Sequence, residues 1–303
     1  MIFPIGLMVT GQIGALVVPA FGWQVMFLIG GVPGLVIAAL LLRLRESPRW
    51  LIGRGRLSEA EAIIREIESS APNAVAGGFQ ASGTPVTGKP QVSGNDATNR
   101  TRWTELLSSF YRRRTVVVWI LWASAYFITN GLNNWMPTLY NRVYGLSLDQ
   151  SLRAGTLTNV AQVTLLLGCA FAIDRIGRRR WMTTGFIVGA ALLAALGTFA
   201  SSSVTAVIAL VTLSYGIVGS VNAVLYLYTP EIYPTRMRAI GTGSATCWLR
   251  LASAAGPLLV GYLVTEQGTG AVFLMFAGAG LIGALAATMT LETRNQRLED
   301  LAP

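Results

Sequence analysis

The chain has 303 residues, of which 52% are hydrophobic and only 12% are charged, and its formal net charge is +9. The charged share is about half of the roughly 25% that is usual in soluble proteins, so the composition indicates an integral membrane protein. The basic residues lie in short clusters between long apolar runs, which points to a membrane surface rather than to nucleic acid as their partner.

Eight apolar runs are long enough to cross a bilayer, whose hydrocarbon core needs about 20 residues of helix. They cover residues 3–20, 24–42, 115–137, 152–173, 181–200, 204–228, 239–264 and 271–291. The sequence therefore predicts an all-α membrane protein with eight transmembrane helices.

The distribution of Lys and Arg predicts the orientation of these helices. Of the 23 basic residues, all but three fall in alternate connecting segments or in the C-terminal tail. The three exceptions are Arg142, Arg153 and Arg250. Because basic loops stay on the cytoplasmic side, we expect residues 43–114 and the C-terminus to lie in the cytoplasm. We expect the protein in the inner membrane of a bacterial cell.

The long basic segment between the second and third runs divides the chain. Within it, 58–69 has the apolar spacing of an interfacial helix, and 71–99 has a composition typical of disorder. Trp103, Leu106, Leu107 and Phe110 predict a second amphipathic helix. The predicted domains are 1–44, 45–114, 115–291 and a tail over 292–303.

Residues that carry metal or catalytic chemistry are scarce. The chain has no His, and its two Cys, Cys169 and Cys247, both lie inside apolar runs. It contains no metal-ligand spacing, nucleotide-binding loop or Ser/His arrangement. We therefore expect no metal, no cofactor and no enzymatic activity.

Four short motifs at the cytoplasmic ends of these runs carry a family resemblance. They are Asp174–Arg180 (DRIGRRR), Glu46–Leu51 (ESPRWL), Glu231–Ala239 (EIYPTRMRA) and Leu291–Arg294 (LETR). In their order and spacing they resemble the signature loops of the major facilitator superfamily, and most closely those of its sugar-porter and metabolite:proton-symporter branch.

The resemblance implies a bundle of twelve helices in two halves of six. The eight runs match the last eight helices of that pattern. Residues 1–44 would hold the last two helices of the N-terminal half, and 115–291 would form a complete C-terminal half. The first four helices would then lie outside this sequence, through a truncated gene or a misassigned start at Met1.

Charged residues in the motifs lie at cytoplasmic helix ends, where carboxylates and guanidinium groups can bridge neighbouring helices. Such bridges form and break as one half of a transporter rocks against the other. The alternative is that they are only topology and helix-end charges. The predicted gating charges are Glu46, Arg49, Asp174, Arg175, Arg178, Arg179, Glu231 and Arg236.

Polar side chains recur on one face of several runs, where they are costly unless they meet a cavity or a partner. We expect them to line a central aqueous pathway, and the alternative for each one is a hydrogen bond between helices. The predicted pathway residues are Tyr126, Asn130, Asn133, Asn134, Asn159, Gln162, Asn222, Tyr226, Thr246 and Arg250.

Arg250 is the most unusual of these residues, because it lies near the middle of the run 239–264 and no Asp or Glu lies mid-run anywhere in the chain. A guanidinium at this depth needs a polar partner. It either binds an anionic substrate, such as a carboxylate-bearing metabolite, or packs between helices.

These observations predict a secondary transporter of a small organic solute, working by alternating access, with organic anions ahead of sugars. The resemblance leaves proton coupling open, and a proton carrier needs a titratable group in the pathway. The alternatives are a sugar transporter and a non-transporting fragment or membrane scaffold. The expected partners are the solute, the bilayer and, if coupled, protons; we expect a monomer.

Overall fold

The computed structural model describes residues 20–44, 46–53, 55–70, 103–199, 203–234 and 236–294, together with isolated positions before residue 20 and Gln296. The described residues are helical or lie in turns and loops, with no β-strand among them. They fall into two compact units, Gly14–Arg100 and Met1–Ile13 with Thr101–Pro303. The segment 71–99, predicted to be disordered, lies outside the described residues, and the predicted domain boundaries stay a prediction.

Seven helices in the described part of the chain are long and apolar enough to span a membrane. They are α2 (Trp23–Leu41), α6 (Arg112–Arg142), α7 (Leu148–Ile176), α8 (Arg178–Phe199), α9 (Val204–Glu231), α10 (Arg238–Glu266) and α11 (Thr269–Thr288). They match seven of the eight predicted runs. At most of their ends, the helices extend a few residues beyond the predicted run. The eighth, 3–20, lies largely outside the described residues.

The unit Gly14–Arg100 contains α2 and two shorter helices, α3 (Pro48–Gly53) and α4 (Leu57–Ser70), which pack against each other. Helix α4 confirms the helix predicted over 58–69. Its exposed side carries ion pairs at helical spacing, Arg56 with Glu59 and Glu61 with Arg65. Exposed pairs of this kind contribute little to stability, so the amphipathic pattern is the stronger reason for the helix.

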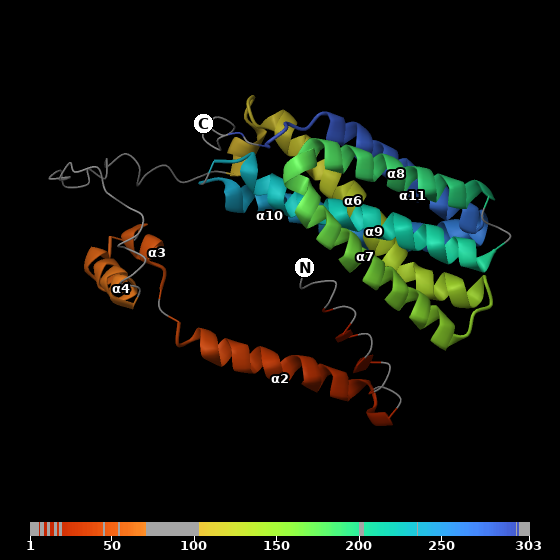
Figure 1. Cartoon of the computed structure of the whole chain (residues 1–303), viewed down its shortest axis with the longest axis horizontal. Coiled ribbons are helices and arrows are strands. Elements are labelled where there is room, and N and C mark those ends of the chain that lie inside the picture. The colour runs from red at the N-terminus through yellow and green to blue at the C-terminus, as the bar shows by residue number, and fades with distance from the viewer. Residues whose placement is uncertain are drawn as a thin grey trace. The chain divides into compact units, whose positions relative to one another are not determined.

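Helices α6 to α11 form one bundle in the second unit (Figure 1). Helix α8 lies against α11 and α9, α6 lies against α10 and α11, and α7 lies against α9. Trp122, Phe186, Phe273 and Phe276 are among the largest fully buried side chains in this core. The apolar runs therefore fold as a layered helix bundle with an aromatic interior.

The amphipathic helix predicted around Trp103–Phe110 was wrong in type and length. The chain there forms a single 3₁₀ turn, η1 (Trp103–Leu107), whose Leu106 is buried while Trp103 and Phe110 are exposed. The Thr115 hydroxyl donates a hydrogen bond to the carbonyl of Leu106. This contact with α6 holds the turn against the bundle, a tertiary effect that apolar spacing alone does not reveal.

Glycines permit the closest approaches between helices. A Cβ at Gly185 or Gly189 on α8 would lie 2.6 or 2.5 Å from a valine methyl of α9. A Cβ at Gly131 on α6 would lie 2.4 Å from the ring of Phe276 on α11, and Gly256 on α10 is also close to Gly131. Helix packing in a membrane depends on small residues at such crossings.

We expect Gly131→Ala to destabilise the bundle by about 1–3 kcal/mol, because the added methyl group would overlap the buried Phe276 ring. Gly168→Ala on α7 is the matched control, since a Cβ there meets nothing within 4 Å. Thermal unfolding of the purified variants in one detergent measures the difference. Equal melting temperatures for the two variants would contradict the close crossing.

Candidate functional site

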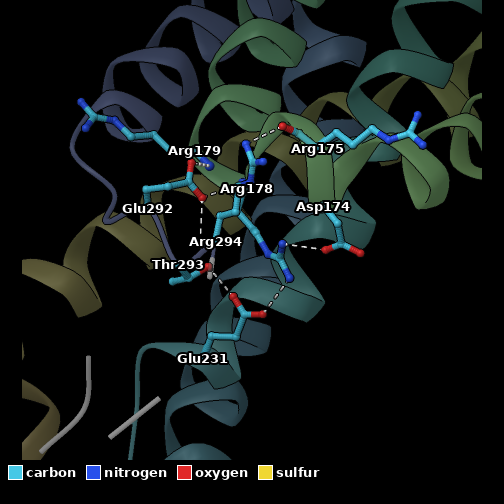
Figure 2. A network of polar contacts seen from close by, with 8 residues as sticks. All are labelled: Asp174, Arg175, Arg178, Arg179, Glu231, Glu292, Thr293 and Arg294. Atoms are coloured by element: carbon cyan, nitrogen blue, oxygen red, sulfur yellow. Dashed lines mark hydrogen bonds and ion pairs between the residues drawn. The ribbon is translucent and has the colours of Figure 1, made fainter. Parts of the chain in front are cut away.

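Four chain segments meet at one end of the bundle through a set of polar contacts, which we call the helix-end network (Figure 2). The segments are the end of α7, the start of α8, the end of α9 and the residues after α11. The network comprises Asp174, Arg175, Arg178, Arg179, Glu231, Glu292, Thr293 and Arg294.

The turn between α7 and α8 depends on Gly177. This residue has a φ of +95°, a conformation that L side chains rarely adopt, and a Cβ there would lie 2.6 Å from the Glu292 carboxylate. The glycine therefore lets α7 end and α8 begin within one residue while leaving space for a carboxylate from another part of the chain.

Glu292 caps α8 from the segment that follows α11. Its Oε1 accepts hydrogen bonds from the backbone N–H groups of Arg178 (3.0 Å) and Arg294 (3.2 Å), and its Oε2 accepts one from that of Arg179 (3.2 Å). The first N–H groups of a helix have no partner within the helix, and a carboxylate there is also favoured by the helix dipole. Glu292 thus joins the C-terminal segment to α8.

Arg178 links α7 to α9 through its guanidinium group. Its Nη1 donates to Asp174 (2.9 Å) and its Nη2 to Glu231 (3.3 Å). The Arg178 and Glu231 side chains are 13% and 18% exposed, whereas that of Asp174 is 78% exposed. Since screening weakens exposed pairs, the contact with Glu231 is the stronger one.

Two further contacts close the network. The Thr293 hydroxyl donates to the second oxygen of Glu231, so this carboxylate is held from both sides. The Arg294 Nη1 donates to the backbone carbonyl of Arg175 (2.6 Å), which satisfies an acceptor at the end of α7. The three residues after Leu291 therefore contact α7, α8 and α9.

The predicted gating charges divide into four groups. Asp174, Arg178 and Glu231 are brought together through their side chains, whereas Arg175 and Arg179 enter the network only through backbone atoms. Arg236 lies apart from it and pairs with Glu105 on η1 at 2.7 Å. Glu46 is exposed in the other unit, and the side chain of Arg49 lies outside the described residues.

Glu292, Thr293 and Arg294 were missed as site residues. They belong to one of the four motifs, but their position in the chain does not indicate which helix their polar atoms reach. The signal available was a carboxylate and a guanidinium two residues apart, directly after the last apolar run.

Next to Arg236, the loop between α9 and α10 is attached to η1 and α6. The Tyr233 hydroxyl lies 2.9 Å from the Thr115 hydroxyl, which donates its own hydrogen to Leu106. Burial raises the pKa of Tyr233, which keeps its phenol protonated and able to donate to Thr115. The predicted gating residue Arg236 thus belongs to a separate contact between this loop and η1.

Two of the amides among the predicted pathway residues form hydrogen bonds between helices. Asn130 on α6 donates to the Ser253 hydroxyl on α10, and Asn222 on α9 donates to the Thr129 hydroxyl on α6 (3.1 Å). These are the contacts expected from the alternative role, in which an amide joins helices. Their part in a pathway stays a prediction.

The remaining amides and Thr246 have varied surroundings. Gln162 is buried against Gly219, and neither its Oε1 nor the Oδ1 of Asn159 has a hydrogen-bond partner among the described residues. Asn134 is exposed, Asn133 is half-buried, and Thr246 bonds within its own helix to the carbonyl of Gly243. Unfilled acceptors are the groups that water or a polar solute can satisfy.

An aromatic and cationic group forms where α6, α9 and α10 meet. Trp122 stacks on Tyr126 with ring centroids 5.6 Å apart and packs edge-on against Tyr226 at 4.7 Å. The hydroxyls of Tyr126 and Tyr226 interact, and Arg250 lies within electrostatic reach of Tyr126. Arg250 is exposed and forms no ion pair or hydrogen bond with the described residues.

The seven long apolar helices in the described part of the chain are those of a multi-pass membrane protein. The profile of the family described as "sugar (and other) transporter" matches residues 3–303, so the chain belongs to that family. The family assignment rests on a match that covers nearly the whole chain.

Two curated relatives illustrate the range of the family. The niacin transporter NiaP of Acinetobacter baylyi is 31% identical over 299 residues, which cover 98% of this chain and 65% of the relative. The putative metabolite transport protein YdjK of Escherichia coli is 27% identical over 99% of this chain and 64% of its own length. The chain thus spans slightly less than two thirds of the length of these relatives.

Solved structures confirm the fold. The proton:xylose symporter XylE bound to 6-bromo-6-deoxy-D-glucose aligns with a TM-score of 0.71 at 23% identity, covering 98% of this chain and 64% of XylE. The inward open conformation of XylE from E. coli aligns with a TM-score of 0.63 at 19% identity, covering 98% and 62%. The predicted major-facilitator-type helical bundle is confirmed.

We expect Glu231→Gln to destabilise the protein by about 1–3 kcal/mol, because it removes a charged acceptor from the largely buried Arg178. Asp174→Asn is the matched control and should cost less than about 1 kcal/mol, since Asp174 is mostly exposed. Thermal unfolding in detergent gives the ranking. A larger loss for Asp174→Asn would contradict the order of strength assigned to the two contacts.

Proposed function

We propose that this protein is a secondary transporter that carries a small organic carboxylate across the inner membrane by alternating access. Membership of the transporter family supports the general activity. The exposed guanidinium of Arg250, which has no ion-pair partner among the described residues and lies within electrostatic reach of Tyr126, supports the carboxylate. This second observation carries the choice of substrate class.

Arg250 lies near the middle of α10, a helix that is long and apolar enough to span the membrane. A guanidinium exposed to lipid at that depth costs several kcal/mol, so such side chains face water, a partner or a ligand. Because Arg250 has no acidic partner among the described residues, an anionic solute would supply the missing countercharge.

The aromatic side chains next to Arg250 favour a ring-bearing carboxylate. Tyr126 and Tyr226 offer flat apolar surface and are held against the buried Trp122, and the two tyrosine hydroxyls add hydrogen-bonding groups. The relative NiaP is named for niacin, which is a pyridine carboxylic acid. Nicotinate is therefore the first solute to test on this chain.

A sugar is the second candidate. The half-buried or exposed amides of Asn133 and Asn134 and the unfilled acceptors of Asn159 and Gln162 are groups that hydroxyl-rich solutes can bond. A sugar has no charge for Arg250 to neutralise, so substitution of that residue should leave sugar binding nearly unchanged. The effect of substituting Arg250 on solute binding therefore distinguishes the two solute classes.

We further propose that the helix-end network stabilises one arrangement of the cytoplasmic helix ends during transport. Arg178 and Glu292 connect α7, α8, α9 and the segment after α11, so relative movement of these ends must break charge-assisted hydrogen bonds. Proton coupling is tested by whether uptake follows an imposed pH gradient.

The substrate prediction compares nicotinate with nicotinamide, which share a ring and differ in charge. We expect nicotinate to raise the melting temperature of the purified chain and nicotinamide to do so much less. Arg250→Gln should weaken nicotinate binding by about tenfold or more, and Arg250→Lys by less, because lysine keeps the charge but loses the two-pronged geometry.

Arg142→Gln is the matched control, because Arg142 is an exposed arginine at the end of α6. It should bind nicotinate like the unmodified chain. Equal binding of nicotinate by well-folded Arg250→Gln protein would contradict the carboxylate site. A response to xylose that Arg250→Gln leaves unchanged would favour the sugar, and no response to any solute would favour a non-transporting scaffold.

The proposed orientation is tested by cysteine labelling in a background with Cys169 and Cys247 replaced by Ala. We expect a membrane-impermeant maleimide to reach Glu61→Cys on α4 only after the cells are opened, because α4 belongs to a basic segment. Ser147→Cys, in the exposed connection before α7, should react in intact cells. The reverse pattern would overturn the orientation.

A further inference from the structure

A cavity of about 380 Å³ lies beside the helix-end network, between the starts of α6 and α8 and the ends of α9 and α11. Three arginines line it, Arg113 and Arg114 from α6 and Arg179 from α8. None of its lining residues is acidic. The cavity therefore concentrates positive charge at the end of the bundle that the basic segments place on the cytoplasmic side.

The guanidinium groups in this cavity differ in their contacts. Those of Arg113 and Arg179 form no ion pair or hydrogen bond with the described side chains, and Arg179 contributes only its backbone N–H to Glu292. Arg114 lies over the ring of Phe110, 4.4 Å from its centroid, and this contact restricts its position. The arrangement presents several cationic donors to one space.

The starts of α6 and α8 carry the same unfavourable charge pattern, and α8 receives a carboxylate at its first turn. Each begins with three consecutive arginines and has no acidic residue in its first turn, although a helix start favours negative charge. At α8 the Glu292 carboxylate caps the first N–H groups. At α6 the residue before the helix, Tyr111, makes no side-chain cap.

The other residues that line the cavity suit a ligand that joins an anionic group to an apolar one. The Tyr228 hydroxyl accepts a hydrogen bond from the backbone N–H of Leu291, and Thr290 adds a second hydroxyl. Phe110, Met289 and Leu291 also line the cavity and are exposed apolar side chains. Hydroxyls with arginines bind oxyanions, and apolar side chains at the same place can contact an acyl chain.

We propose that this cavity binds a phosphate group of net negative charge, held by Arg113, Arg114 and Arg179. The geometry of a guanidinium group matches two phosphate oxygens at once, and three such groups from two helices surround the space. The phosphate belongs either to the headgroup of an anionic phospholipid or to a soluble phosphorylated compound. It supplies at α6 the negative charge that Glu292 supplies at α8.

The experiment uses the full chain in a phosphate-free maltoside detergent and measures melting temperature against ligand concentration. The probes are short-chain phosphatidylglycerol, short-chain phosphatidylcholine, in which a choline cation offsets the phosphate, and inorganic phosphate at constant ionic strength. We expect a saturable rise in melting temperature with phosphatidylglycerol or with inorganic phosphate, and a much weaker one with phosphatidylcholine.

Two double variants with the same loss of charge distinguish binding in the cavity from general electrostatic attraction of anions. Arg113→Gln/Arg179→Gln removes arginines that line the cavity, and Arg112→Gln/Arg180→Gln removes their neighbours that do not. The cavity variant should need about tenfold or more ligand to reach half the shift. The neighbour variant should stay within about twofold of the unmodified chain, because it changes only the screened surface charge.

The single variant Arg113→Gln gives the same comparison with Arg112→Gln if the double variant does not fold. Phosphatidylglycerol acting alone identifies a lipid headgroup, and inorganic phosphate acting equally well identifies a soluble phosphate; both support the site. Equal weakening in the cavity and neighbour variants, or no shift with either anionic probe, overturns the proposal. The readout is binding, so it does not depend on the solute that is transported.

Discussion

The largely buried pairing of Arg178 with Glu231 is the interaction on which the helix-end network depends. A guanidinium removed from water is costly unless it is paired, and the two Nη atoms of Arg178 bond to carboxylates from two different helices. The Thr293 hydroxyl donates a hydrogen bond to Glu231. Glu292, the residue before Thr293, caps α8. Ends of helices far apart in sequence are therefore joined by charge-assisted hydrogen bonds at one place.

The middle of the bundle follows a different physical rule. There the helices approach through glycines, such as Gly131 against Phe276, and amides such as Asn130 and Asn222 pair with hydroxyls on the next helix. Dispersion and single hydrogen bonds hold this region, and charge is nearly absent. Arg250 is the exception among these residues. Its surroundings differ from those of Arg178, which pairs with two carboxylates. One arginine has its counterions in the chain, and the other has none among the described residues.

The starts of α6 and α8 show how one sequence pattern can have two structural outcomes. Both begin with three consecutive arginines. In the structure Arg178 turns inward to Glu231 while Arg113 and Arg179 face a cavity. The difference comes from Glu231 and Glu292, which lie in parts of the chain remote from either helix start.

The sequence by itself determined the membrane class, the positions of seven described helices and the family, because long apolar runs and short motifs between them are local properties of the chain. It also placed Asp174, Arg178 and Glu231 among the residues of interest. Only the tertiary structure decided which charges meet: it paired Arg236 with Glu105, brought in Glu292, Thr293 and Arg294, and reduced the helix expected near Trp103 to one 3₁₀ turn. Spacing along a helix fixes which face a side chain occupies. The partner on that face comes from another helix, so it depends on how the helices pack.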